Sequence, residues 1–158
     1  MIDDFAAWRR LVDLYADYTA CVDEGRFEAW PDFFTEDGRY RIVARENHEL
    51  GLPLSLVDLD GAGMLRDRVY AIQSTLFHAP YYQRHLVGAP RLLEPDGDLV
   101  RCEANYLVIR TKRDEPGEVF SAGRYLDRIR LGPDGPRFVE RVCVYDTELI
   151  ANSLIYPI

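Results

Sequence analysis

The C-terminal half of the chain carries four long runs of strand-forming residues, and these runs restrict the possible folds more than any other feature. They cover residues 84–93, 99–112, 118–131 and 137–150. The breaks between them, "EPDGD", "RDEPGE" and "GPDGP", are short turns that join antiparallel neighbours. Strands of about 12 residues cannot stay flat, because sheets twist. The pattern predicts a strongly curved meander.

The N-terminal half has helical periodicity. Residues 4–24 repeat apolar side chains at alternating steps of three and four, which predicts an amphipathic helix. Further on we expect a short helix at 27–34, a strand at 38–46, a long loop at 47–63 and a helix at 64–77. The order predicts one α+β domain over residues 1–158. Its antiparallel or mixed sheet would wrap around three helices from the N-terminal half as a cone.

Composition narrows the class of protein. A hydrophobic fraction of 47% and a charged fraction of 29% are typical of a soluble globular domain. The net charge of −8 argues against nucleic acid and anionic membranes as partners. No apolar run approaches the ~20 residues of a membrane helix and no leader opens the chain, so a cytoplasmic location is expected. Cys21, Cys102 and Cys143 lack metal-site spacing and are expected to be free thiols.

A search for cofactor and metal motifs finds little. The histidines His48, His78 and His85 form no helical ligand pair. A site built from His78, His85 and an acid across a bend is geometrically possible, but ordinary structural positions are favoured. The stretch "GAGMLRD" at 61–67 lacks the preceding strand and the terminal Lys-Ser/Thr of a phosphate loop, so it is interpreted as a helix entry.

Catalysis inside a cone is an alternative. Curved-sheet cones can hold a general base whose pKa is tuned by burial. The candidates are His85, Asp37, Tyr40, Asp127 and Tyr106. The apolar face of 99–112 predicts that Tyr106 points inward, where filling the core is the commoner role. We therefore expect no catalytic residue in this chain, with a free-standing isomerase or dehydratase, or a small-ligand binder, as alternatives.

Several blocks of sequence resemble a known family. They are "RENHELGLPL", "MLRDRVYAI", "YYQRHLVGAP", "SAGRYLDRI" and "RVCVYDTELIANSLIYPI". Together with the order of elements, they resemble the small (β) subunits of aromatic-ring-hydroxylating oxygenases, the Rieske non-haem iron enzymes. The strongest marks are Gly-Arg-x-x-Asp at 123–127 and Arg-Val-x-x-x-Asp at 141–146. The chain looks closest to members that act on aromatic carboxylates, such as salicylate 5-hydroxylase, followed by anthranilate- and terephthalate-type oxygenases.

This resemblance implies an NTF2-like fold, similar to SnoaL-like proteins, scytalone dehydratase and ketosteroid isomerase, and an α3β3 assembly. It implies a large (α) subunit that carries the Rieske [2Fe-2S] cluster, the mononuclear iron and the substrate pocket. It implies that the small subunit holds no cofactor, metal or catalytic residue and supports a monooxygenase or dioxygenase fed with electrons from NAD(P)H. A Rieske centre needs two Cys and two His at fixed spacing, a set that this sequence lacks.

Residues 137–145 suggest how subunits would meet, because neither face of this strand is purely polar. Alternation groups Phe138 with Val142, and groups Arg141 with Cys143. We expect the convex sheet surface to be buried against other subunits, with arginine stems packed on tyrosines and arginine heads paired with partner carboxylates. The residues expected there are Arg124, Tyr125, Arg128, Arg141, Tyr145, Ile155 and Tyr156. A bulged strand with an ordinary solvated face would produce the same pattern.

The uncharged residues Leu149–Ile158 are part of the same hypothesis. Chain ends usually fray unless they dock on something. We expect this segment to dock on a partner, so that truncation after Glu148 would prevent assembly.

Overall fold

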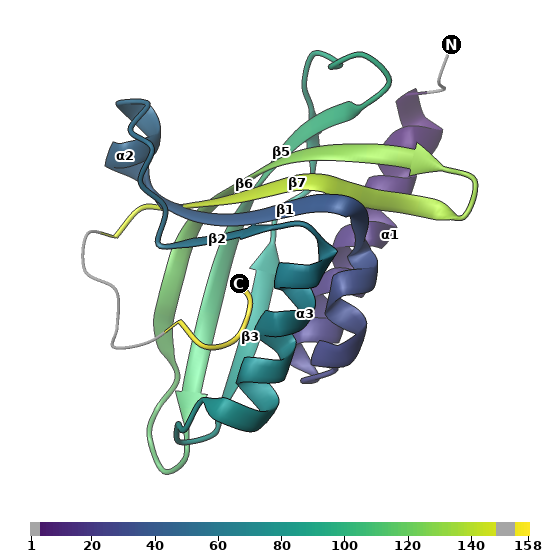
Figure 1. Ribbon diagram of the computed structural model, residues 1–158. Coiled ribbons are helices and arrows are strands. Elements are labelled where there is room, and N and C mark those ends of the chain that lie inside the picture. Colours follow the sequence, from purple (N-terminus) through teal and green to yellow (C-terminus); the bar gives the residue numbers. More distant parts are fainter. Residues whose placement is uncertain (1–3, 148–153) are drawn as a thin grey trace.

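A computed structural model describes residues 4–147 and 154–158, which form a curved sheet with helices packed in its concave side (Figure 1). The sheet has seven strands in the order β2-β1-β7-β6-β5-β3, and β4 pairs with β5. The strands are β1 Phe34–Ala44, β2 Val57–Asp60, β3 Tyr81–Val87, β4 Arg91–Leu92, β5 Val100–Lys112, β6 Glu118–Gly132 and β7 Gly135–Tyr145. The helices are α1 Asp4–Asp23, the 3-10 helix η1 Phe27–Phe33, α2 Arg45–Glu49, α3 Ala62–Tyr70 and the π-helical turn η2 Ala71–Thr75.

The predicted architecture is confirmed in its main lines. Strands β5, β6 and β7 form the antiparallel meander that the Pro, Gly and Asp turns indicated. The sheet is mixed, because β1 pairs in parallel with β7. Helices α1 and α3 lie against the concave face, as Figure 1 shows. In the described part of the chain, none of the helices is both long and apolar enough to cross a membrane.

Three predicted segments differ from the structure. The stretch 47–63 is not one loop, because it contains the end of α2 and the edge strand β2. Alternation of Val57 and Leu59 with two aspartates forms that short strand, and Asp58 binds Arg39 of β1 at 2.6 Å. The predicted strand 84–93 begins earlier, at Tyr81, and is interrupted after Val87 before β4 begins. The predicted helix 64–77 begins at Ala62, and its last turn is η2.

A β-bulge changes the faces of β7. Arg128 pairs with Glu140, whereas its neighbour Ile129 pairs with Phe138, so Val139 is an extra residue on β7. The extra residue reverses the alternation, because side chains on a strand alternate with a period of two. Phe138 therefore faces inward together with Arg141, and the phase predicted from simple alternation is wrong. The bulge of the alternative interpretation is present, although Val142 and Val144 on the outer face of β7 are buried and that face is not simply solvated.

The glycine of the Gly-Arg-x-x-Asp block has a steric cause. A Cβ atom on Gly123 would lie 1.9 Å from the backbone oxygen of Val144 on β7. No side chain tolerates that contact, so only glycine lets β6 and β7 approach each other this closely. The motif thus marks a position where the backbones of β6 and β7 lie very close together.

Candidate functional site

The centre of the cone holds a buried ion pair. Arg141 on β7 donates from Nε to Asp127 Oδ1 at 3.0 Å and from Nη2 to Asp127 Oδ2 at 2.7 Å. Both side chains have an exposed fraction of 0%. Burial alone would lower the pKa of Arg141, but the Asp127 carboxylate holds this pKa well above its usual value. The guanidinium is therefore a fixed positive charge inside the domain.

Aromatic rings surround this guanidinium. Its carbon Cζ lies 3.9 Å from the ring centre of Tyr125 and 4.0 Å from that of Phe138. Tyr18 and Tyr15 follow at 4.3 and 4.9 Å. The hydroxyl of Tyr15 also donates to Asp127 Oδ2 at 2.5 Å. Cation–π contacts and the bidentate pair together offset the cost of removing the two charges from water.

Two residues that were predicted to contact a partner subunit therefore lie in the interior of this chain. Arg141 and Tyr125 were expected on the convex surface, but both are fully buried in the concave core. The prediction is wrong because the face of β7 that Arg141 shares with Cys143 is turned toward the core, and Tyr125 pairs with Cys143 on that same face. Tyr145 is also buried inside, in the same core.

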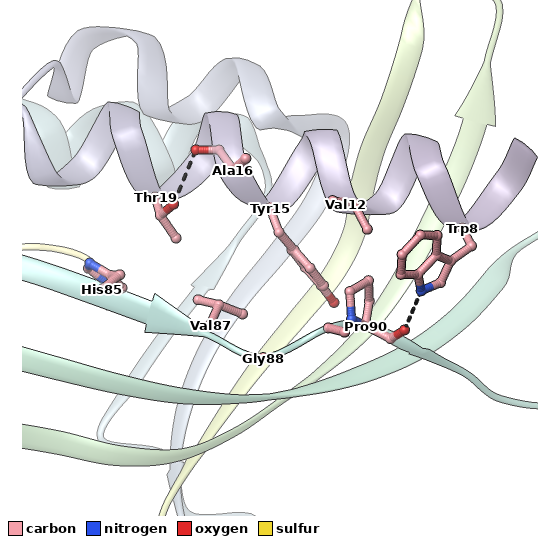
Figure 2. Close-up of a pocket in the computed structure, with 10 residues that line it drawn as sticks. Trp8, Val12, Tyr15, Ala16, Thr19, His85, Val87, Gly88 and Pro90 are labelled. Atoms are coloured by element: carbon pink, nitrogen blue, oxygen red, sulfur yellow. Dashed lines mark hydrogen bonds between the residues drawn. The ribbon is translucent and has the colours of Figure 1, made fainter. Parts of the chain in front are cut away.

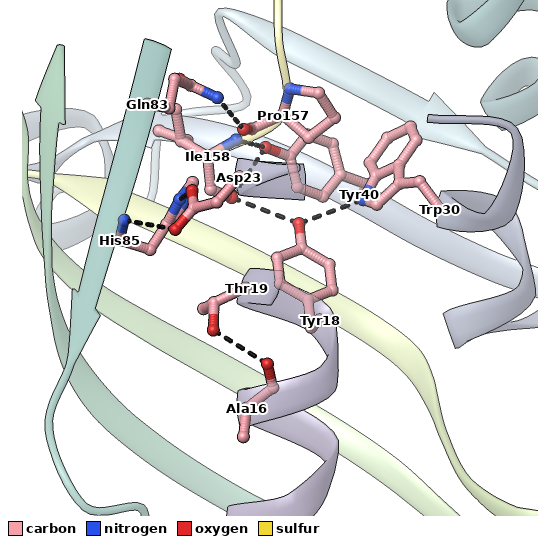
Figure 3. Close-up of polar contacts among 10 residues, drawn as sticks. All are labelled: Ala16, Tyr18, Thr19, Asp23, Trp30, Tyr40, Gln83, His85, Pro157 and Ile158. Carbon is pink, nitrogen blue, oxygen red and sulfur yellow. Dashed lines mark hydrogen bonds and ion pairs between the residues drawn. The ribbon is translucent and has the colours of Figure 1, made fainter. Parts of the chain in front are cut away.

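The last five residues enter the cone. Ile158 is fully buried, and its backbone N–H donates to the hydroxyl of Tyr40 at 2.9 Å. The hydroxyls of Tyr40 and Tyr18 donate to the Ile158 oxygen at 3.2 and 3.3 Å, and Figure 3 shows them converging on it. Gln83 Nε2 donates to the Pro157 oxygen at 3.1 Å. The interior of the cone is thus occupied by the chain's own side chains and by residues 154–158.

The same segment corrects the expected docking of the tail. Ile155 is buried in the chain's own core, and the ring of Tyr156 stacks on Phe27 at 4.7 Å and packs at a tilt against Tyr81 at 4.5 Å between centroids. Arg68 on α3 also donates to the Ile155 oxygen at 3.1 Å. Residues 154–158 therefore pack on their own domain. The rest of the predicted tail, 148–153, lies outside the described residues.

A second buried polar pair joins α1 to the sheet edge. His85 Nδ1 donates to Asp23 Oδ1 at 2.5 Å, and the backbone N–H of His85 donates to Asp23 Oδ2 at 2.9 Å (Figure 3). The exposed fractions of the two side chains are 0% and 5%. His85 Nε2 is buried and has no hydrogen-bond partner. His85 is a candidate from the sequence, whereas Asp23 is not, because 62 residues separate the two and no local motif links them.

A groove of about 380 Å³ lies beside this pair (Figure 2). The α1 side chains Trp8, Val12 and Thr19 form one wall, and residues 87–90 form the other. Trp8 Nε1 donates to the Pro90 oxygen at 2.8 Å. Figure 2 places Trp8 and His85 at opposite ends of the groove.

The outer face of the sheet carries paired charges. Arg128 binds Asp96 at 2.8 Å and approaches Glu140 at 3.9 Å, and Arg124 approaches Glu103 at 3.8 Å. The arginine side chains are about two fifths exposed, at 42% and 41%. Beside them lies a small apolar cluster composed of Val43, Leu126, Val142 and Val144. Arg124 and Arg128 thus point outward as predicted, although each has a partner within the chain.

The remaining sequence candidates are dispersed. Asp37 is exposed, and a hydrogen bond from Thr35 lowers its pKa. Tyr106 points inward, as predicted, and its hydroxyl contacts Ser121 at 3.0 Å. His78 Nε2 contacts the Tyr156 hydroxyl at 2.8 Å, away from the Asp23 partner of His85. Within residues 4–147 and 154–158, no three His, Cys, Asp or Glu side chains gather closely enough to hold a metal ion.

The three cysteines are buried free thiols, as predicted. Burial raises the pKa of Cys102 and Cys143 to about 12 and also raises the pKa of Cys21. With a pKa of about 12, only about one thiol in 10,000 is ionised at pH 8, and the thiolate is the reactive form. We expect no alkylation of Cys102 and Cys143 in the folded protein at pH 8, and full alkylation in urea, measured by mass spectrometry. Rapid labelling of either thiol in the folded protein would contradict this.

Comparisons with known proteins identify the class of domain first. The SnoaL-like domain family matches residues 5–142. A solved structure assigned as the β subunit of an aromatic-ring-hydroxylating dioxygenase from Novosphingobium aromaticivorans superposes with a TM-score of 0.85. It shares 38% identity and covers 92% of this chain and 93% of its own. The fold is therefore that of a SnoaL-like cone.

Sequence relatives identify the group of proteins within this domain family to which the chain belongs. The small subunit of anthranilate 1,2-dioxygenase from Burkholderia cepacia is 34% identical over 100% of this chain and 98% of its own length. A β subunit of the terminal oxygenase component of terephthalate 1,2-dioxygenase from Comamonas sp is 31% identical over 90% and 93%. The chain belongs to the SnoaL-like family of small subunits of aromatic-ring-hydroxylating dioxygenases, as the resemblance predicted.

Proposed function

We propose that this chain is a non-catalytic structural subunit of an aromatic-ring-hydroxylating oxygenase. In this proposal it forms a trimer within an α3β3 complex and holds the large subunits in place. The large subunits carry the Rieske cluster, the mononuclear iron and the pocket for an aromatic carboxylate such as salicylate. The relatives named above support the substrate class, since their names refer to anthranilate and terephthalate.

The observation that carries the proposal is the filled cone. A cone enzyme needs a cavity in which a base reaches its substrate. Here the corresponding space contains the Arg141–Asp127 pair with its aromatic shell, and residues 154–158 close it. The carboxylate of Asp127 accepts hydrogen bonds from Arg141 and Tyr15, so it is not available as a base. This arrangement supports a structural role and argues against a free-standing isomerase or dehydratase.

We infer that the outer face of the sheet is the contact surface for other subunits. Arg124 and Arg128 keep about two fifths of their side chains exposed, beside the apolar cluster Val43, Leu126, Val142 and Val144. An arginine that already binds one carboxylate can exchange it for a carboxylate of another subunit. It can also bind both carboxylates at once, because its guanidinium has several donors.

Co-purification tests this surface. We expect the double substitution Arg124→Glu and Arg128→Glu to lower recovery of a co-expressed, tagged large subunit about tenfold, because like charges across an interface repel. The matched control is Arg9→Glu, which changes a 67% exposed arginine on α1. Both variants should keep the circular dichroism spectrum of the unaltered chain. Equal recovery with both variants would remove these arginines from the interface.

The assembly itself requires a separate test. Analytical ultracentrifugation of the co-expressed complex should give a mass that corresponds to three copies of each subunit, with iron stoichiometric to the large subunit. A chain that stays monomeric beside its large subunit, or that turns over an aromatic acid alone, would contradict the proposed function.

A further inference from the structure

Residues 50–56 form an uncharged segment that exposes four leucines to solvent. Leu50, Leu52, Leu54 and Leu56 keep between 42% and 64% of their surface accessible. They stand two residues apart in the irregular stretch between the short helix α2 and the edge strand β2. A run of exposed apolar side chains is typical of a surface that another molecule covers. We call residues 50–56 the leucine segment.

The leucine segment is held in place by hydrogen bonds to β1. The Leu56 N–H donates to the Ile42 oxygen at 2.8 Å. Arg41 donates from Nε and Nη2 to the Ser55 hydroxyl at 3.3 and 3.2 Å. Figure 1 shows α2, directly before the segment, standing clear of the sheet. The conformation of the segment is therefore set before a partner binds, which lowers the entropy cost of an interface.

A groove of about 580 Å³ lies at the opposite edge of the sheet, where β3 pairs with β5. Ala79, Pro80 and Tyr82 line it from the start of β3, and Tyr82 is 80% exposed. Lys112 and Arg113 line it from the end of β5. We call this the β3–β5 groove. Its mainly apolar lining suits aliphatic side chains, and its cations suit an acidic neighbour.

The leucine segment and the β3–β5 groove are complementary in charge as well as in polarity. Arg113 at the groove is exposed and forms no hydrogen bond or ion pair within the described part of the chain. The exposed carboxylate of Glu46, one helical turn before Leu50, likewise has no partner among the described residues. Opposite charges beside an apolar contact steer association and fix its register. A molecule that carries both surfaces is a second copy of this chain.

We propose that the leucine segment of one copy docks into the β3–β5 groove of the next copy, so that three copies close a ring. This inference rests on the proposed function, which includes the trimer. A symmetric ring of three needs two different surfaces on each chain, because a contact between identical surfaces joins only two copies. The segment lies at the β2 edge of the sheet and the groove at the β3 edge, so the two do not meet within one chain.

Analytical ultracentrifugation of the chain alone tests this contact with two double variants. The segment variant combines Leu52→Glu with Leu54→Glu, and the groove variant combines Ala79→Glu with Tyr82→Glu. All four side chains are exposed, so both variants should keep the circular dichroism spectrum of the unaltered chain. The unaltered chain should sediment as a trimer, and each variant should associate at least about 100-fold more weakly, because it buries unpaired carboxylates. The control Arg9→Glu makes the same change in net charge on α1 and should stay trimeric.

A mixture of the two variants distinguishes a head-to-tail contact from any other. The segment of the groove variant can still enter the groove of the segment variant, so the mixture should form 1:1 dimers and no trimers. The inference is overturned if the mixture stays monomeric at about 100 µM of each variant, if either variant stays trimeric, or if the unaltered chain alone is monomeric. The proposed function is tested separately, since it fails if a trimeric chain does not join a large subunit.

Discussion

Replacement of Asp127 by alanine is expected to lower the free energy of unfolding by about 3–5 kcal/mol, because it leaves the charge of Arg141 buried without its carboxylate. Arg141 and Asp127 are both fully buried, and the pair is bidentate. The hydroxyl of Tyr15 loses its acceptor in the same variant. Arginine cannot escape the cost by deprotonation, because a guanidinium keeps its proton in proteins even without a carboxylate partner. Urea unfolding followed by circular dichroism measures the loss.

Two controls make this test specific. Asp96→Ala removes the carboxylate partner of Arg128 on the exposed outer face, and it should cost less than about 1 kcal/mol. The double variant Asp127→Leu with Arg141→Met removes both buried charges, so it should be more stable than Asp127→Ala alone. A loss below about 1 kcal/mol for Asp127→Ala would show that the guanidinium does not depend on this carboxylate.

Removal of residues 154–158 is expected to destabilise the domain by a similar amount, about 3–6 kcal/mol, from the buried area of two isoleucines. Ile158 is fully buried and Ile155 nearly so. The truncation also removes the hydrogen-bond partners of the Tyr40 hydroxyl and of Gln83. Both polar groups would then face an opened cavity at the centre of the cone. The urea midpoint of a chain ending at residue 153 measures the effect.

Single substitutions provide the matched comparison for this truncation. Ile158→Ala should cost about 2–5 kcal/mol, because it leaves a cavity among packed aromatic rings. Val119→Ala removes two methyl groups from a side chain that is 64% exposed and should change stability by no more than about 0.5 kcal/mol. Unfolding of the truncated chain at the same urea concentration as the unaltered chain would show that the segment contributes nothing to the folded state.

Most of the fold could be predicted from the sequence, because local signals and global packing agree there. The turns at 94–98, 113–117 and 132–136 predicted the antiparallel meander, and the spacing of apolar residues predicted the helix α1. Strand β2 was missed, because it is only four residues long and becomes a strand by pairing with β1. The bulge at Val139 was foreseen only as an alternative, because it is a property of two strands in register and leaves no mark in either strand alone.

The site was harder to predict than the fold. Arg141 was correctly singled out as unusual, but it was expected on the outer face of the sheet and lies in the core. A charged residue on a strand is normally assigned to the surface. Asp127 was named as a base candidate, yet its partner was not foreseen. Asp23 carried no signal, because an acid at the end of an amphipathic helix usually faces water. Long-range pairs of this kind become visible only when the topology brings their elements together.

The position of β7 has a consequence for how the chain folds. This strand lies between β6 and β1, and its parallel partner β1 ends about a hundred residues earlier in the sequence. The meander of β5, β6 and β7 and the β1–β2 pair can each assemble locally, whereas the parallel pairing of β1 with β7 must close a loop of about a hundred residues. The contact between β1 and β7 is therefore expected to form late in folding, after the local strand pairs are in place.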